Sequence, residues 1–134
     1  MKRLKERIGM ATAVPESPLS RWLSGTIQYV DQQEIHVDYT IRKEMTDEND
    51  NIHPGLLSVL QTEVAELMYF LITGIQIRVV TNIHNHFIRK SPLGSKVSVN
   101  AKALSGHFKQ DIETTIRDES GQITAIGRIT FSAA

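Results

Sequence analysis

Two carboxylates stand inside the most apolar stretch of the chain. Glu63 and Glu66 interrupt the segment from Asn51 to Gly74, NIHPGLLSVLQTEVAELMYFLITG, in which most residues are apolar. A carboxylate among apolar side chains must reach water, find a partner or exchange protons with a substrate. Both residues are therefore candidates for acid–base chemistry. A salt bridge at a subunit interface or a solvated place at a helix end is the alternative.

The apolar residues of this segment predict one long buried helix. They do not keep to a single helical stripe, and a helix that is apolar nearly all round is buried in protein or in a membrane. Polar residues break the run so that about 18 uncharged residues never occur in a row, and we predict no membrane span. Gly74 predicts the end of the helix. The apolar positions are Leu56, Leu57, Val59, Leu60, Val64, Ala65, Leu67, Met68, Phe70, Leu71 and Ile72.

A polar loop leads into this helix. Residues 46–51, TDENDN, include no apolar side chain, and His53 stands directly before Pro54 and Gly55. Asp47 and His53 can satisfy the first N–H groups of the helix, which is the interpretation we favour. A catalytic role at the helix start is the alternative for both side chains.

Two histidines further along form a second candidate group. His84 and His86 are two residues apart in a strand-like run and therefore share a face. A His-x-His pair can bind zinc, but the sequence offers no third ligand. We predict no metal site and expect this strand to pair with its own copy across a dimer.

The remaining chain consists of short elements that must position these groups. Ser17 is a candidate cap for a short helix that contains Trp22. A strand is predicted at 26–31, and a clearer one at 35–41, where apolar and polar residues alternate. After the long helix, strand-like runs at 75–89, 97–103, 112–116 and 123–131 are separated by short turns.

This order of elements predicts an α+β fold. Late strands joined by short turns are typically antiparallel, and a curved antiparallel sheet of five to six strands can wrap one long central helix. We predict an N-terminal tail or short helix at 1–16 and a single domain at 17–134.

Composition excludes several classes of protein. The 134 residues contain 15 basic and 15 acidic side chains, so no overall charge favours nucleic acid or a membrane surface. Cysteine is absent, which excludes disulfides and a thiol nucleophile. The basic start, MKRLKERI, is not followed by the apolar core of a signal peptide, and we expect a cytoplasmic protein.

Three stretches, in order and spacing, resemble a known family. They are SPLSRWLSG near the start, VDYTIRKEMTDENDNIHPG before the helix, and the end from Val80 through HFIRKSPLG to DESGQITAIGRITF. Together they span about residues 17 to 132 and are similar to hotdog-fold acyl-CoA thioesterases of the phenylacetate-pathway and 4-hydroxybenzoyl-CoA type. The resemblance implies a hotdog fold, an acyl-CoA substrate without a separate cofactor, and a homodimer with sites at the subunit boundary. A tetramer is the alternative assembly.

The catalytic pattern of the family is altered in this chain. The resemblance implies an Asn, a His-Gly-Gly at the helix start, and an acidic residue nine positions after the His. The corresponding residues here are Asp47, His53, Pro54 in place of the first Gly, and Thr62 in place of the acid. Proline has no N–H to polarise a carbonyl, and a threonine hydroxyl without a partner is a poor base. Glu63 is the nearest acid, but one step along a helix turns a side chain by about 100°, so it reaches such a site only if the helix start is shifted.

Three functions remain open on these residues. The leading prediction is an acyl-CoA hydrolase in which Glu63 is the acid–base or nucleophilic group and the Gly55 N–H binds the carbonyl. The alternative is an inactive hotdog module that binds acyl ligands. A hydroxyacyl thioester dehydratase, which uses Pro-Gly at its helix start, is a minor alternative, because this chain has Thr46 and Leu60 where that family needs a His and an acid.

Basic residues near the turns are the candidates for holding coenzyme A. By resemblance, Arg89, Lys90 and His107 are placed to meet its phosphates. A solvated face is the alternative for these side chains.

Overall fold

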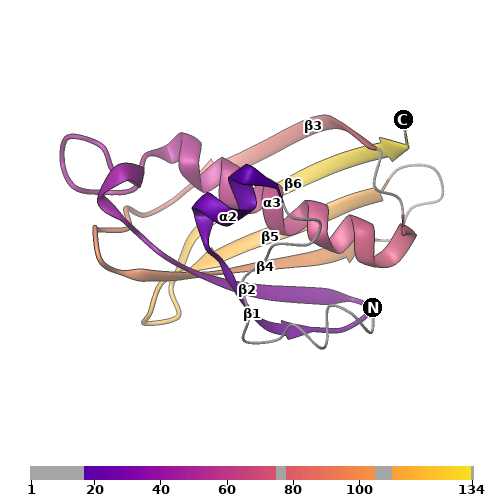
Figure 1. Cartoon of the computed structure of the whole chain (residues 1–134), viewed down its shortest axis with the longest axis horizontal. Coiled ribbons are helices and arrows are strands. Elements are labelled where there is room, and N and C mark those ends of the chain that lie inside the picture. Colours follow the sequence, from indigo (N-terminus) through magenta and orange to yellow (C-terminus); the bar gives the residue numbers. More distant parts are fainter. Residues whose placement is uncertain (1–16, 75–77, 105–109, 134) are drawn as a thin grey trace.

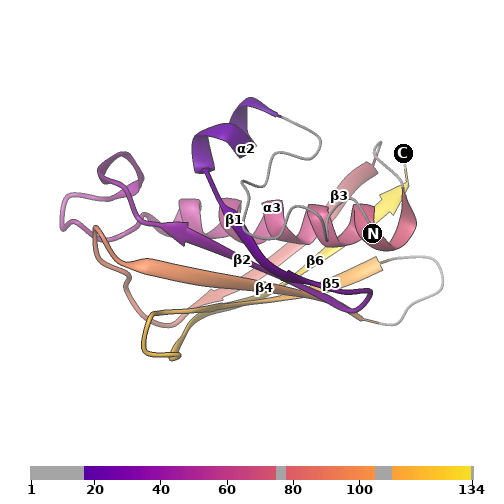
Figure 2. The same cartoon turned by 60° about the horizontal axis from the view of Figure 1, so that its bottom comes forward.

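A computed structural model describes residues 17–74, 78–104 and 110–133 of the chain. The elements follow in the order α2 (Pro18–Leu23), β1 (Thr26–Val30), β2 (Glu34–Thr40), the 3-10 turn η1 (Lys43–Met45), α3 (Pro54–Thr73), β3 (Arg78–Phe87), β4 (Lys96–Leu104), β5 (Gln110–Arg117) and β6 (Ile123–Ala133). One curved sheet lies along α3, and α2 sits beside that helix (Figure 1). A second view shows the sheet curving below the helix (Figure 2).

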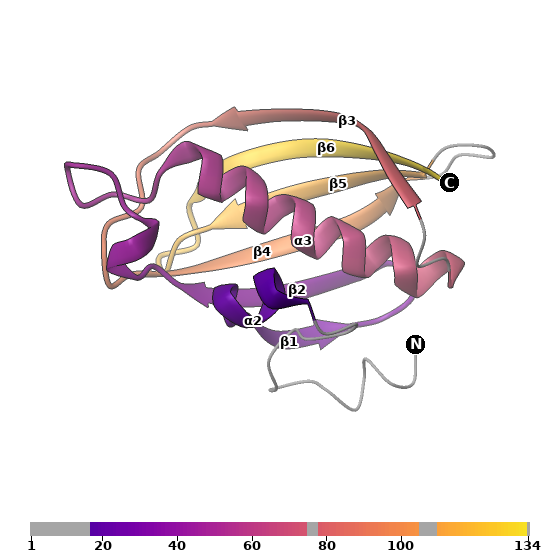
Figure 3. The same cartoon turned by 45° about the horizontal axis from the view of Figure 1, so that its top comes forward.

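The sheet has six strands in the order β1-β2-β4-β5-β6-β3, and every pair is antiparallel. This confirms the predicted curved antiparallel sheet around a central helix. The two strands that follow α3 are not neighbours, although a short turn joins them. β3 pairs with β6 at one edge, and β4 pairs with β2 and β5 in the middle. The turn therefore carries the chain across the sheet, as Figure 3 shows.

The inner face of the sheet is built by alternation. Ile35, Val37 and Tyr39 of β2 are buried, while His36 and Asp38 between them are only partly buried. Val97, Val99 and Ala101 repeat the pattern on β4. A period of two places one apolar face of each strand against the helix. The predicted half-buried strand at 35–41 is thus confirmed.

α3 is the predicted long helix, and it begins at Pro54 rather than at Asn51. Proline is favoured in the first turn because its missing N–H would have no partner there. Gly74 ends the helix with a φ of 71°, and its N–H donates to the Phe70 carbonyl at 2.7 Å. By length and composition α3 could cross a membrane, but half of its most apolar window is buried within the protein. Its contacts with β2, β4, β5 and β6 are those of a core helix.

The short helix α2 is fixed at both ends. Ser17 caps its start as predicted, because the Ser17 hydroxyl oxygen accepts from the Ser20 N–H at 3.0 Å. At the other end Arg42, which follows β2, donates to the carbonyls of Trp22 and Leu23 and stacks on the Trp22 ring, 4.9 Å from its centroid. These contacts hold α2 against the end of β2 and beside α3.

Candidate functional site

The start of α3 satisfies its own polar groups. The Gly55 N–H donates to Nδ1 of His53 at 2.9 Å, so His53 is the N-cap of the helix. Pro54 has no N–H. The capping interpretation of His53 is therefore confirmed, and the backbone donor that we predicted for a substrate carbonyl already has a partner in the same turn.

Asp47 closes the loop before the helix instead of capping the helix itself. Its Oδ1 accepts from the N–H groups of Asn49 at 2.9 Å and Asn51 at 3.2 Å. These backbone bonds hold the pKa of Asp47 below its usual value, and the charges of Lys90 and His53 act in the same direction. The structure thus brings Asp47, His53 and Lys90 to the same end of the molecule.

A pocket of about 380 Å³ runs along α3, between α2 and the edge strand β3. Its floor is the helix from Ser58 to Phe70, and its walls come from the start of α2 and from Arg78 and Ile83 of β3. The residues that line it are Ser17, Leu19, Ser20, Ser58, Val59, Thr62, Glu63, Glu66, Leu67, Phe70, Arg78 and Ile83.

Glu63 lines this pocket, and a hydrogen bond from the sheet holds its carboxylate. Only 7% of the residue is exposed, and the buried hydroxyl of Tyr39 on β2 donates to its Oε1. Thr62 lines the same pocket, so both neighbouring side chains of the helix border it. The pocket is wide enough across the helix for the side chains of both Thr62 and Glu63 to line it.

The other predicted groups on α3 are committed to partners. The Thr62 hydroxyl donates to the Ser58 carbonyl at 2.7 Å, one turn back in the same helix. Glu66 forms an ion pair with Arg78 of β3, with 2.5 Å between Oε2 and Nη2. Glu66 therefore joins α3 to the edge strand β3. Glu63 remains the candidate catalytic acid, and the Tyr39 hydroxyl is its hydrogen-bond donor.

A group of buried and partly buried amides and hydroxyls beside the pocket was not predicted. Nδ2 of Asn85 on β3 donates to the Ser58 hydroxyl at 3.0 Å, and Nε2 of Gln61 donates to the Thr114 hydroxyl at 3.1 Å. The two amides meet over the bare Cα of Gly127, because a Cβ built there would lie 1.9 Å from Asn85 Oδ1 and 2.9 Å from Gln61 Nε2. Sequence spacing gives no sign of this group, since three strands and a helix supply it.

The remaining predicted residues lie apart from the pocket. Arg89 and Lys90 are exposed in the segment after β3, and the backbone of Ser91 beside them bonds to Ile52 just before α3. His107 lies outside the described residues. His84 and His86 share the exposed face of β3 with 3.1 Å between their Nε2 atoms, and no group of three metal ligands is found among the described residues.

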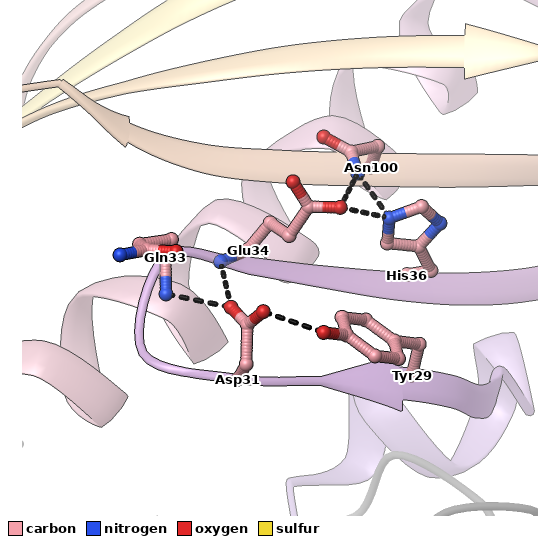
Figure 4. A network of polar contacts seen from close by, with 6 residues as sticks. All are labelled: Tyr29, Asp31, Gln33, Glu34, His36 and Asn100. Atoms are coloured by element: carbon pink, nitrogen blue, oxygen red, sulfur yellow. Dashed lines mark hydrogen bonds and ion pairs between the residues drawn. The ribbon is translucent and has the colours of Figure 1, made fainter.

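A second polar network lies on the outer face of the sheet, where β1, β2 and β4 meet (Figure 4). Nε2 of His36 lies 2.6 Å from Glu34 Oε1 and 2.5 Å from Asn100 Nδ2. The Tyr29 hydroxyl donates to Asp31 at 2.5 Å, and this bond to a carboxylate raises the pKa of Tyr29. None of these side chains lines the pocket beside α3.

Comparison of the structure with solved structures gives a consistent match. The E. coli PaaI protein from the phenylacetic acid degradation operon superposes with a TM-score of 0.82 at 16% identity, covering 90% of this chain and 87% of that one. Zebrafish thioesterase superfamily member 2 gives 0.80 at 16% identity and 91% coverage of both chains. The Haemophilus influenzae thioesterase HI1161 gives 0.79 at 19% identity, covering 89% of this chain and 84% of that one. No protein-family model and no curated protein sequence matches the chain.

These neighbours share the architecture of a curved sheet around one long helix over nearly the whole chain. The protein therefore has the hotdog fold that its sequence predicts. Identities of 16 to 19% establish the fold and leave the chemistry to be argued from the residues of this chain.

Proposed function

We propose that this protein hydrolyses acyl thioesters of coenzyme A in the pocket beside α3. The observation that carries the proposal is Glu63, a carboxylate that is 93% buried yet lines a pocket and accepts a hydrogen bond from Tyr39. Burying an acid is costly unless it has partners, and a carboxylate held at a pocket wall can take a proton from water at a bound substrate.

The reaction needs one base and one bound water. Glu63 takes a proton from the water as its oxygen adds to the thioester carbonyl carbon. The tetrahedral intermediate then collapses, the carbon–sulfur bond breaks with its electron pair on sulfur, and the protonated Glu63 returns its proton to the thiolate. The products are the free acid and coenzyme A, and Glu63 is regenerated.

The residues that line the pocket favour a substrate with an apolar acyl chain, and two basic residues outside it are the candidates for meeting a phosphate-bearing carrier. Val59, Leu67 and Phe70 supply apolar surface along the helix. Lys90 lies near the start of α3, close enough to Asp47 for its charge to lower the pKa of that acid. Lys90 and Arg89 are therefore the basic side chains that we expect to attract the phosphates of coenzyme A.

The edge strand β3 supports a homodimer. It has one sheet neighbour, β6, and Val79, Ile83 and Phe87 along it are each 46% exposed. An exposed apolar edge strand is a liability that proteins cover. Pairing β3 with its copy about a two-fold axis covers the edge and sets the two pockets next to the subunit boundary.

The dimer is tested by placing a charge on this edge. Phe87→Glu is the variant, and Leu93→Glu, at an exposed apolar residue in the turn after β3, is the matched control. We expect sedimentation velocity to show dimers for the natural chain and the control and monomers for Phe87→Glu. Dimers of unchanged stability in Phe87→Glu would contradict an interface at this edge.

The hydrolase is tested with a panel of acyl-CoA thioesters and measurement of thiol release. Glu63→Gln keeps the shape of the side chain and removes the base, and we expect a loss in kcat of about 100-fold or more. Glu113→Gln, an exposed acid on β5, is the matched control and should behave as the natural chain. Equal turnover by the natural chain and Glu63→Gln would remove Glu63 from the mechanism.

A second candidate function has one observation in its favour. Because the Gly55 N–H is bonded to His53 and Pro54 has none, the helix start offers no free donor of the kind used by the family that the sequence resembles. An inactive module that binds acyl-CoA would need no such donor. Binding of acyl-CoA in calorimetry without thiol release, in the natural chain and in Glu63→Gln alike, would favour this function over hydrolysis.

A further inference from the structure

We propose that the Ser58 hydroxyl, set by Asn85, is the hydrogen-bond donor to the thioester carbonyl oxygen in the pocket. The inference rests on the proposed hydrolysis and names a catalytic residue for it. It moves the electrophilic half of the site from the start of α3 to the second turn of that helix.

The need for such a donor follows from the helix start. Negative charge develops on the carbonyl oxygen as water adds, and a fixed donor for that oxygen is usually the largest single contribution to acyl transfer. Pro54 has no N–H, and the Gly55 N–H is 2.9 Å from Nδ1 of its own N-cap His53. A donor must therefore come from another part of the pocket.

Ser58 has a hydrogen to give. Its oxygen accepts from Nδ2 of Asn85 at 3.0 Å, so that bond does not use the hydroxyl hydrogen. Within residues 17–74, 78–104 and 110–133, no acceptor for this hydrogen is found. Ser58 lines the pocket and lies on the same helix as Glu63, five positions earlier. An oxygen that accepts one hydrogen bond also becomes a stronger donor through its own hydrogen.

Nδ2 of Asn85 is the atom that faces Ser58. Its Oδ1 is buried over Gly127 and has no hydrogen-bond partner among the described residues, and Nε2 of Gln61 lies on the same side of that glycine. The direction of the bond from Asn85 to Ser58 leaves the serine hydrogen for the pocket.

Other hydroxyls in the pocket are less suited to this role. The Thr62 hydroxyl hydrogen goes to the Ser58 carbonyl, and the Ser17 hydroxyl hydrogen goes to Ser20. Ser20 keeps its own hydrogen, but it lies on α2 and not on the helix that carries Glu63. Ser20 is accordingly the rival that the experiment must separate from Ser58.

The experiment measures turnover and the state of the carbonyl separately. Turnover of the best acyl-CoA is compared among the natural chain, Ser58→Ala, Ser20→Ala and Asn85→Ala, with Ser98→Ala on the outer face of β4 as the matched control. In parallel, infrared spectra are recorded with a ketone analogue of the acyl-CoA thioester that carries carbon-13 at the carbonyl. In this analogue a methylene group separates the carbonyl carbon from the sulfur atom, so the compound binds but is not hydrolysed. A hydrogen bond to the carbonyl lowers its stretching frequency.

We expect Ser58→Ala to lose about 100-fold in kcat with little change in KM, as for removal of one carbonyl donor. The bound carbonyl band should be lowered in the natural chain and in Ser98→Ala, and return toward its free position in Ser58→Ala. Asn85→Ala should show a partial return of the band and a smaller loss in kcat, which a merely structural role for Asn85 would not produce.

Two kinds of result overturn the inference, and they are distinct from failure of the hydrolase. Turnover that falls with Glu63→Gln but not with Ser58→Ala leaves hydrolysis standing and removes Ser58, as does a loss confined to Ser20→Ala. If the natural chain turns over no thioester, a lowered carbonyl band that Ser58→Ala abolishes still supports the contact, whereas an unshifted band rejects it.

Discussion

The first turn of α3 and the two turns that follow it carry similar polar groups, yet they use them in opposite ways. In the first turn, the His53 ring accepts from the Gly55 N–H within two residues, and both residues are exposed. In the second and third turns, the polar contacts cross the fold, since Ser58 bonds to Asn85 on β3 and Glu63 bonds to Tyr39 on β2.

This difference shows which part of the helix is built to face a ligand. A local cap costs little free energy and leaves no donor for a substrate, because the N–H group already has its acceptor within the same turn. Polar groups brought together from distant strands must be desolvated, and a fold keeps them where they complete a site or specify packing. The pocket lies over the helix from Ser58 to Phe70, so the chemistry is expected there.

The same substitution at a glycine beside each group gives the largest contrast, with Gly55 in the first turn and Gly127 on β6 below Asn85. Gly127→Ala would place a Cβ 1.9 Å from Asn85 Oδ1, whereas Gly55→Ala meets only the His53 ring, at 3.1 Å. Overpacking of this kind costs about 1–3 kcal/mol. We expect a loss of about 3 kcal/mol in the free energy of unfolding by urea for Gly127→Ala. For Gly55→Ala we expect little change, because the higher helix propensity of alanine opposes the cost of the contact with the His53 ring. Asn85→Ala should partly rescue Gly127→Ala, and equal losses for the two glycines would remove the amide group from the account.

Tyr39→Phe tests the buried contact of the third turn. It removes the hydroxyl that donates to Glu63 and leaves the ring, so we expect a loss of about 2 kcal/mol in the free energy of unfolding. Because the lost bond favours the ionised acid, the acid limb of the kcat–pH profile should move to higher pH. Tyr29→Phe, on the outer face, is the matched control. An unmoved profile in Tyr39→Phe would mean that Glu63 is not the titrating base.

His53→Ala tests the first turn alone. It removes the acceptor of the Gly55 N–H, and loss of an N-cap typically costs about 1 kcal/mol, measurable by urea unfolding. The Gly55 N–H then loses its side-chain acceptor. If Ser58 is the carbonyl donor, kcat should change far less than in Ser58→Ala. A clear rise in kcat would instead show that Gly55 becomes the donor once His53 is gone.

The same comparison shows which parts of the fold and of the site the sequence could predict. Alternation at 35–41 and the apolar run from Leu56 to Ile72 predict β2 and α3, because both patterns are local. The place of β3 beside β6 is not local, and a short turn to β4 suggests the wrong neighbour. Glu63 could be named from its buried helix, but its partner Tyr39 lies 24 residues earlier and Asn85 lies 27 residues after Ser58. Contacts between distant strands depend on sheet order, which no spacing in the chain records.

The smallest effect is expected in the loop that precedes the first turn. The folded pKa of Asp47 is lowered by the N–H groups of Asn49 and Asn51, so the stability that it adds is complete above its unfolded pKa of about 3.9 and disappears as pH falls through the lower folded value. The asparagine side chain of Asp47→Asn does not ionise, so this pH-dependent contribution to stability is absent from the variant. The gap in thermal midpoint between the natural chain and Asp47→Asn should therefore be constant at neutral pH and close below about pH 4. A gap that persists in acid would show that the loop depends on the shape of the side chain rather than on its charge.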